Sequence, residues 1–164
     1  MALTPYCTND EVRAVLGITQ SEIKDEVLDL PIYEMGLKRE LNRISPSLPA
    51  AFSTVNGLSA LTSAEQTFKE AVQVFSVYAV ARQAGAPLGL SAPKSLNDDK
   101  SGFSRYADSP YRDVLERVDM MFQQARQDLV DAFAAYAGAT SAAFSGMPAG
   151  LALSSRSYDP VTGA

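Results

Sequence analysis

The sequence contains no histidine and a single cysteine, Cys7. Without an imidazole the chain cannot build the Ser-His or Cys-His nucleophile of many hydrolases, a histidine metal ligand, or the Glu-x-x-His pattern of di-iron bundles. One cysteine also gives no intrachain disulfide. Cys7 directly precedes a predicted helix, so we interpret it as a small apolar residue at the helix entry rather than as a nucleophile.

Several other signatures are missing. Neither the GxxxxGK[ST] phosphate-binding loop nor the GxGxxG dinucleotide motif occurs in the sequence. No run of about eighteen apolar residues would span a membrane, and the N-terminal residues lack the basic and apolar regions of a signal peptide. We therefore expect a soluble, non-enzymatic protein of a reducing compartment, without cofactor or metal. The 19 acidic against 14 basic residues argue against a dedicated DNA-binding surface.

The most apolar segment runs from Thr62 to Gly85. Its apolar residues occupy nearly every face of a helix, so other elements must cover it on most sides. Thr62 with Glu65, or Ser63 with Gln66, has the spacing of a capping box, and Gly85 could supply a left-handed stop. We expect a central, buried helix here.

A second long helix is predicted from Pro110 to Tyr136, with Ser109 as its N-cap. One uninterrupted apolar stripe at helical spacing comprises Tyr111, Val114, Val118, Phe122, Ala125, Leu129, Ala132 and Tyr136. The side chains that widen this stripe are interpreted as core filler: Met120, Met121 and Phe133. The two long helices should pack antiparallel through Phe68, Phe75, Val118, Phe122 and Leu129. The predicted fold class is all-α, a helical bundle.

The N-terminal part predicts shorter helices. Thr8 and Glu11 form a capping box, and Gly17 should end that helix. Thr19 and Glu22 repeat the spacing and open a longer helical pattern, which Pro31 should kink or break. Its apolar residues fall on one face: Ile23, Val27, Leu30, Leu37, Leu41 and Ile44. The charged residues opposite are interpreted as a solvated face, with an interface as the alternative.

Two loops are predicted, at residues 45–61, where Pro46 and Pro49 prevent a continuing helix, and at residues 86–109. The segment from Asn97 to Asp108 places oxygen-bearing side chains as an EF-hand loop does. However, Lys100 adds positive charge and no glutamate closes the loop, so a polar turn is favoured over a calcium site.

Residues 138–164 are rich in Ala, Gly and Ser and nearly uncharged. Apolar residues recur through them: Phe144, Met147, Leu151, Leu153 and Tyr158. We predict a helical domain at 1–137 and an extended C-terminal arm at 138–164 that docks on another subunit. The alternative is a flexible segment without a role.

The order of these elements resembles that of the head-to-tail connector, or neck adaptor, proteins of tailed bacteriophages. The opening from Tyr6 to Ile44 resembles theirs, especially Asp10–Arg13 leading to Leu16–Gly17. The segment from Lys94 to Lys100, followed by Ser104-Arg105-Tyr106, is similar to the S-x-x-D-G-x-x-S-x-x-R-[FY] segment between their long helices. Asp99 stands where that pattern has a glycine.

This resemblance implies a structural virion protein, assembled in the host cytoplasm. Its copies would form a ring, commonly of twelve, beneath the portal ring, extend the DNA channel without specific DNA binding, and offer a platform for tail or tail-nozzle proteins. The loop residues implied as an interface are Lys94, Asp98, Asp99, Lys100, Arg105 and Tyr106. Two alternatives remain: a small terminase-type DNA-packaging component, which should show a basic recognition helix, and a regulatory bundle that binds one protein partner.

Overall fold

The computed structural model describes residues 3–87, 96–98, 101–103 and 112–145. The elements are α1 (Asn9–Leu16), α2 (Asp25–Leu28), α3 (Pro31–Ile44), α4 (Leu48–Asn56), α5 (Ser63–Gly85), β1 (Leu96–Asp98), β2 (Ser101–Phe103) and α7 (Arg112–Ser145). The helical fold class is confirmed. Of the helices that the structure describes, none combines the length and the hydropathy that a bilayer crossing requires.

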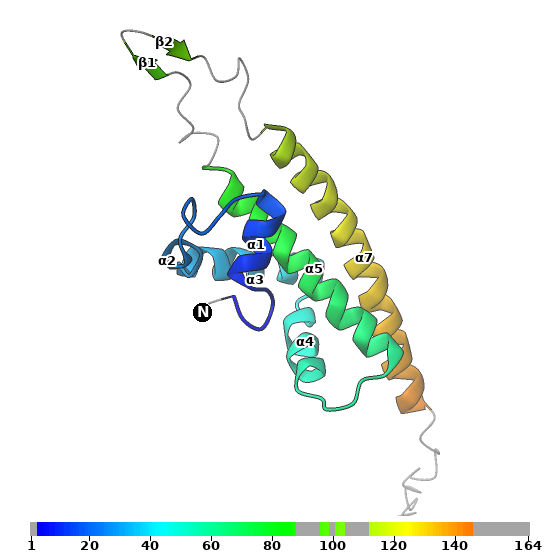
Figure 1. Cartoon of the computed structure of the whole chain (residues 1–164). Helices are drawn as coiled ribbons and strands as arrows, with labels where there is room; N and C mark the ends of the chain where they lie inside the picture. The colour runs from blue at the N-terminus through cyan, green and yellow to red at the C-terminus, as the bar shows by residue number, and fades with distance from the viewer. Residues whose placement is uncertain (1–2, 88–95, 99–100, 104–111, 146–164) are drawn as a thin grey trace, which may run out of the picture.

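Helix α5 lies at the centre of the fold and is contacted by α1, α3, α4 and α7 (Figure 1). Thr62 is its N-cap: its backbone N–H donates to Glu65 Oε2 at 2.8 Å, and the Glu65 N–H donates back to Thr62 Oγ1 at 3.4 Å. The capping box therefore uses Thr62 and not Ser63. The buried side chains include Phe68, Val72, Phe75, Ala79 and Val80.

The expected left-handed stop at Gly85 is wrong. Gly85 is the last helical residue, and Ala86 continues in right-handed geometry with φ −55°. A Cβ at Gly85 would lie 2.5 Å from Leu115 Cδ2 and 3.2 Å from Leu16 Cδ2. Gly85 therefore leaves room for the Leu115 side chain of α7 and the Leu16 side chain of α1, and it serves packing rather than a turn.

Helices α5 and α7 run antiparallel, as predicted (Figure 1). The rings of Phe75 and Phe122 lie 5.3 Å apart, and those of Phe68 and Tyr136 stack at 4.8 Å. The predicted seam is buried at Phe68, Phe75, Val118, Phe122 and Leu129. The predicted start at Pro110 falls outside the described residues. The predicted end at Tyr136 is too early, because α7 continues to Ser145.

The loop predicted at 45–61 instead contains a helix, α4. Pro49 stands at its second position, where the missing N–H has no helical acceptor in any case. Leu48, Phe52 and Val55 are buried, and the Phe52 ring stacks on Tyr6 at 4.9 Å. Pro49 therefore stands in the first turn of α4, whereas Pro46 follows the end of α3.

The break expected at Pro31 is confirmed, but the helix expected to open at Thr19 is wrong. Thr19 N–H donates to Glu22 Oε2 at 2.7 Å, but this pair closes a turn and not a helix. Helix α2 is one short turn, and α3 begins with Pro31 as a helix start. Because α2 and α3 are separate helices, the predicted apolar face divides: Ile23, Leu37 and Leu41 are buried, whereas Val27 and Leu30 are exposed.

The predicted loop at 86–109 contains a short antiparallel hairpin, in which Asn97 pairs with Gly102 and Asp98 with Ser101. This is the segment that partly matches an EF-hand. Its middle residues, Asp99 and Lys100, lie outside the described residues.

Candidate functional site

Cys7 is buried, with an exposed fraction of 5%. Burial, and secondarily the charge of Glu11, raise the pKa of its thiol to about 12, so the sulfur is protonated and a poor nucleophile. Within the described ranges, no group of three or more Cys, Asp or Glu side chains is arranged to hold a metal ion. The absence of catalysis and of bound metal stays a prediction that needs measurement.

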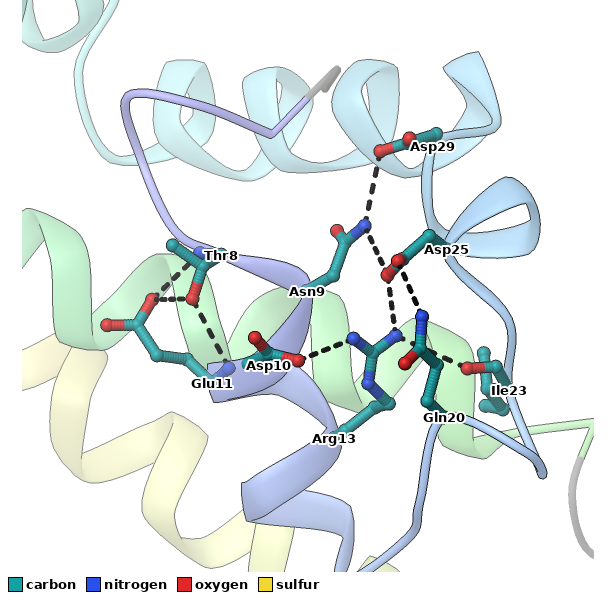
Figure 2. Close-up of polar contacts among 9 residues, drawn as sticks. All are labelled: Thr8, Asn9, Asp10, Glu11, Arg13, Gln20, Ile23, Asp25 and Asp29. Atoms are coloured by element: carbon teal, nitrogen blue, oxygen red, sulfur yellow. Dashed lines mark hydrogen bonds and ion pairs between the residues drawn. The ribbon is translucent and has the colours of Figure 1, made fainter.

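The main polar cluster of the described chain surrounds Arg13 of α1, as Figure 2 shows. Arg13 is buried, and its guanidinium donates to Asp25 at 2.8 Å, to Asp10 at 2.5 Å and to the Ile23 carbonyl at 3.3 Å. Hydrogen bonds to Asp10 and then Asp25 raise the pKa of Arg13 further. A buried arginine is tolerated here because its donors are paired.

The carboxylates of this cluster are also occupied. Asn9 Nδ2 donates to Asp25 at 3.1 Å and to Asp29 at 3.3 Å, and Gln20 Nε2 donates to Asp25 at 3.0 Å. The hydrogen bond from Arg13 is the main cause that lowers the pKa of Asp25, followed by the one from Asn9. Asp25 is therefore an ionised structural acceptor and not a proton donor. Although a pocket of about 310 Å³ lies beside it, we interpret the cluster as a clamp that fixes α2 on α1.

The clamp positions an apolar patch at the α2–α3 corner. Its exposed side chains are Val27 (41%), Leu30 (48%), Ile32 (67%) and Met35 (65%). Beneath the patch, Gly36 lies against Gln83 of α5 so closely that a Cβ would collide with it. Further along α3, Arg39 and Arg43 continue the exposed stripe of Ile32 and Met35 at helical spacing. These four residues are termed the α3 face.

A second exposed face lies on α7. Between residues 112 and 140, where burial is described, only one stripe of this helix is buried, from Val118 to Ala132, and the opposite side faces outward. Exposed residues there recur at steps of three, four and seven: Asp113, Glu116, Met120, Gln127 and Asp131, which are termed the α7 face. The interpretation of Met120 as core filler is wrong, since 64% of its surface is exposed.

A shallow pocket of about 400 Å³ also lies between α1, α5 and α7. Its lining is mainly apolar and includes Val15, Tyr78, Val114 and Met121, with Arg117 as the charged member. It brings together no set of converging polar groups of the kind that orients a small ligand.

The residues predicted from sequence as an interface loop and as a docking arm are mostly not placed. Lys94, Asp99, Lys100, Arg105 and Tyr106 lie outside the described residues, whereas Asp98 belongs to β1.

Of the arm, Met147, Leu151, Leu153 and Tyr158 lie outside the described residues. Phe144 belongs to α7, because this helix passes without a break through the boundary predicted at residue 138. Residues 138–145 are therefore helical and not extended as predicted. Ala and Ser sustain a helix there, and one glycine costs only about 1 kcal/mol.

Comparison of the chain with protein-family models, with curated proteins and with solved structures gives no match in any of the three. The α3 face, the α7 face and the clamp around Arg13 are therefore the features that bear on function.

Proposed function

We propose that this chain is a structural subunit of a phage head-to-tail connector. In this proposal its copies form a ring under the portal, extend the DNA channel and present a platform to tail proteins. The observation that carries the proposal is the exposure of apolar side chains on two different faces, at the α2–α3 corner and on α7, with α5 between them (Figure 1). A ring subunit needs two different surfaces, because each copy contacts its two neighbours through unlike faces.

Charge supports a conduit more than a specific DNA binder. Helix α7 carries Arg112, Arg117 and Arg126, but its acidic residues outnumber them: Asp113, Glu116, Asp119, Asp128 and Asp131. A recognition helix should be basic, since phosphate contacts provide most of the affinity for DNA. A channel through which DNA slides is better served by weak contacts.

The proposal also assigns residues 146–164 a role, as an arm that docks on another subunit. Met147, Leu151, Leu153 and Tyr158 provide spaced apolar anchors in a segment with little charge. Small side chains bury too little surface to offset chain entropy in isolation, so such a segment gains most when it becomes ordered on a neighbouring copy or on the portal.

The experiment that tests the proposal mixes the purified full chain with portal rings and images the product by electron microscopy. We expect a closed ring of additional density on one end of the portal. Portal rings without added density, at concentrations well above micromolar, would contradict the proposal.

DNA binding distinguishes the packaging-component alternative. For a connector subunit we expect weak binding to duplex DNA that is independent of sequence and disappears at physiological salt. Sequence-specific binding that survives such salt would favour the packaging component.

A further inference from the structure

The α3 face is apolar at its beginning and basic at its end. Ile32 and Met35 are the two most exposed large apolar side chains at the α2–α3 corner. Arg39 follows them, exposed and without an ion pair among the described residues, and Arg43 pairs only with Glu40 of its own helix, at 2.6 Å. Ion pairs of this kind at the surface contribute little to stability, so Arg43 can pair with a carboxylate of another molecule at little cost.

The α7 face has the complementary order. Asp113 and Glu116 stand at its beginning, and Met120, 64% exposed, follows one turn later. In the described part of the chain, Glu116 is paired only with Arg112 of the same helix, at 2.9 Å, and both side chains are about two-thirds exposed. The acidic side chains and the exposed methionine thus occupy one surface within two turns of helix.

We propose that the α3 face of one copy packs antiparallel against the α7 face of a second copy of this chain. In this register Arg43 lies opposite Asp113, Arg39 opposite Glu116, and Met35 opposite Met120. The spacing fits: Arg43 to Met35 spans eight residues, or about 12 Å, and Asp113 to Met120 spans seven, or about 10.5 Å.

The occupant is a second copy because the two faces are complementary and lie on different sides of one molecule. Helices α3 and α7 each pack on α5 (Figure 1). The α3 face therefore cannot pack on the α7 face of the same chain. A contact between unlike faces repeats from copy to copy and closes into a ring or continues as a filament. The inference deepens the proposed function, since it names the contact from which the ring is built.

The contact also explains the clamp around Arg13. Four exposed apolar side chains at one corner need a rigid support if they are to form a specific interface. The Asp25 carboxylate, held by Arg13, Asn9 and Gln20, supplies it by joining α2 to α1.

The test uses two charge-reversed full-length variants. In the first, Arg39→Glu and Arg43→Glu make the α3 face acidic; in the second, Asp113→Lys and Glu116→Lys make the α7 face basic. Each variant alone brings like charges together, so we expect its self-association in sedimentation equilibrium to weaken by roughly tenfold or more. An equimolar mixture restores opposite charges at every contact and should recover the wild-type mass. Circular dichroism should show unchanged helicity, because all four positions are exposed.

A matched control is Asp131→Lys, which reverses an exposed charge on the same face but outside the proposed register. It should associate like the wild type. If Asp131→Lys weakens association while the Asp113 and Glu116 reversals do not, the antiparallel register is wrong. If the second variant associates as well as the wild type, Asp113 and Glu116 take no part in the contact and the proposal is wrong. A wild-type chain that stays monomeric up to about millimolar concentration also overturns it.

The outcomes separate this inference from the proposed function. If mixing the two variants restores association but the wild-type chain does not bind portal rings, the contact between the α3 face and the α7 face is supported and the connector function is rejected. If both variants add a ring of density to portal rings as readily as the wild type, the connector function is supported and the contact between the α3 face and the α7 face is rejected.

Discussion

The two longest helices, α5 and α7, differ in how they are covered. Helix α5 has 23 residues and is contacted by α1, α3, α4 and α7. Helix α7 has 34 residues and is buried along a single stripe against α5, with a smaller contact to α1. The same antiparallel pair therefore contains one helix that is covered on several sides, although Val74 stays 49% exposed, and one whose outer surface remains available. Substitutions on α5 should change stability, whereas those on the outside of α7 should change assembly.

The largest effect is expected at the centre of α5. Phe75→Ala removes a fully buried ring that lies 5.3 Å from Phe122, and should lower the free energy of unfolding by about 3–5 kcal/mol in urea denaturation. The matched control is Met120→Ala on the outer side of α7, which should change it by less than about 0.5 kcal/mol. Similar losses for the two variants would remove the distinction between the helices.

A smaller effect is expected at the start of α5. Thr62→Ala removes the side chain that accepts from the Glu65 N–H, and should cost about 1 kcal/mol. Ser63→Ala, one residue on, provides the control and should be nearly neutral because Ser63 is not the N-cap. A larger loss from Ser63→Ala than from Thr62→Ala would show that the helix begins one residue later.

The clamp around Arg13 should give a dependence on pH. Because the folded state lowers the pKa of Asp25 below its ordinary value of 3.8, Asp25 stabilises the fold above that value. The contribution should be lost as the pH falls through the lowered pKa. Thermal unfolding measured between pH 6 and pH 2.5 should fall less steeply for Asp25→Asn than for the wild type. Asp128→Asn, which removes an exposed carboxylate of α7 outside the clamp, is the matched control.

The smallest effect on stability is expected at the C-terminal end. Removing residues 146–164 should leave the helicity and the melting temperature nearly unchanged, while it weakens assembly. Removing residues 138–164 also deletes the last turns of α7, next to the stacking of Tyr136 on Phe68, and should lower the melting temperature slightly. If the shorter deletion already unfolds the protein, the segment belongs to the subunit's own core.

The difference between α5 and α7 also shows which parts of the fold the sequence could predict. Periodicity located both long helices, and the Thr62–Glu65 spacing located a cap, because these signals are local. The same periodicity could not show that Met120 is exposed. Coverage depends on how many neighbours surround a helix, and α7 has few.

The remaining misses have other physical causes. Pro49 favours a helix when it stands in the first turn and prevents one elsewhere, so the prolines alone could not reveal α4. The Arg13–Asp25 pair joins residues twelve positions apart across a turn, where no local pattern specifies the partner. The α3 face could be traced only once the break before Pro31 had fixed the phase of that helix.

The most direct test of the central claim, that the outer side of α7 serves assembly, is disulfide trapping between two copies. Met35→Cys and Met120→Cys chains are mixed in equal amounts and oxidised, while the buried native Cys7 remains protected. We predict a covalent dimer that contains one chain of each kind. Met35→Cys mixed with Leu58→Cys, an exposed position after α4, should give little of it. Equal yields from the two mixtures, or only Met35→Cys homodimers, would contradict the account.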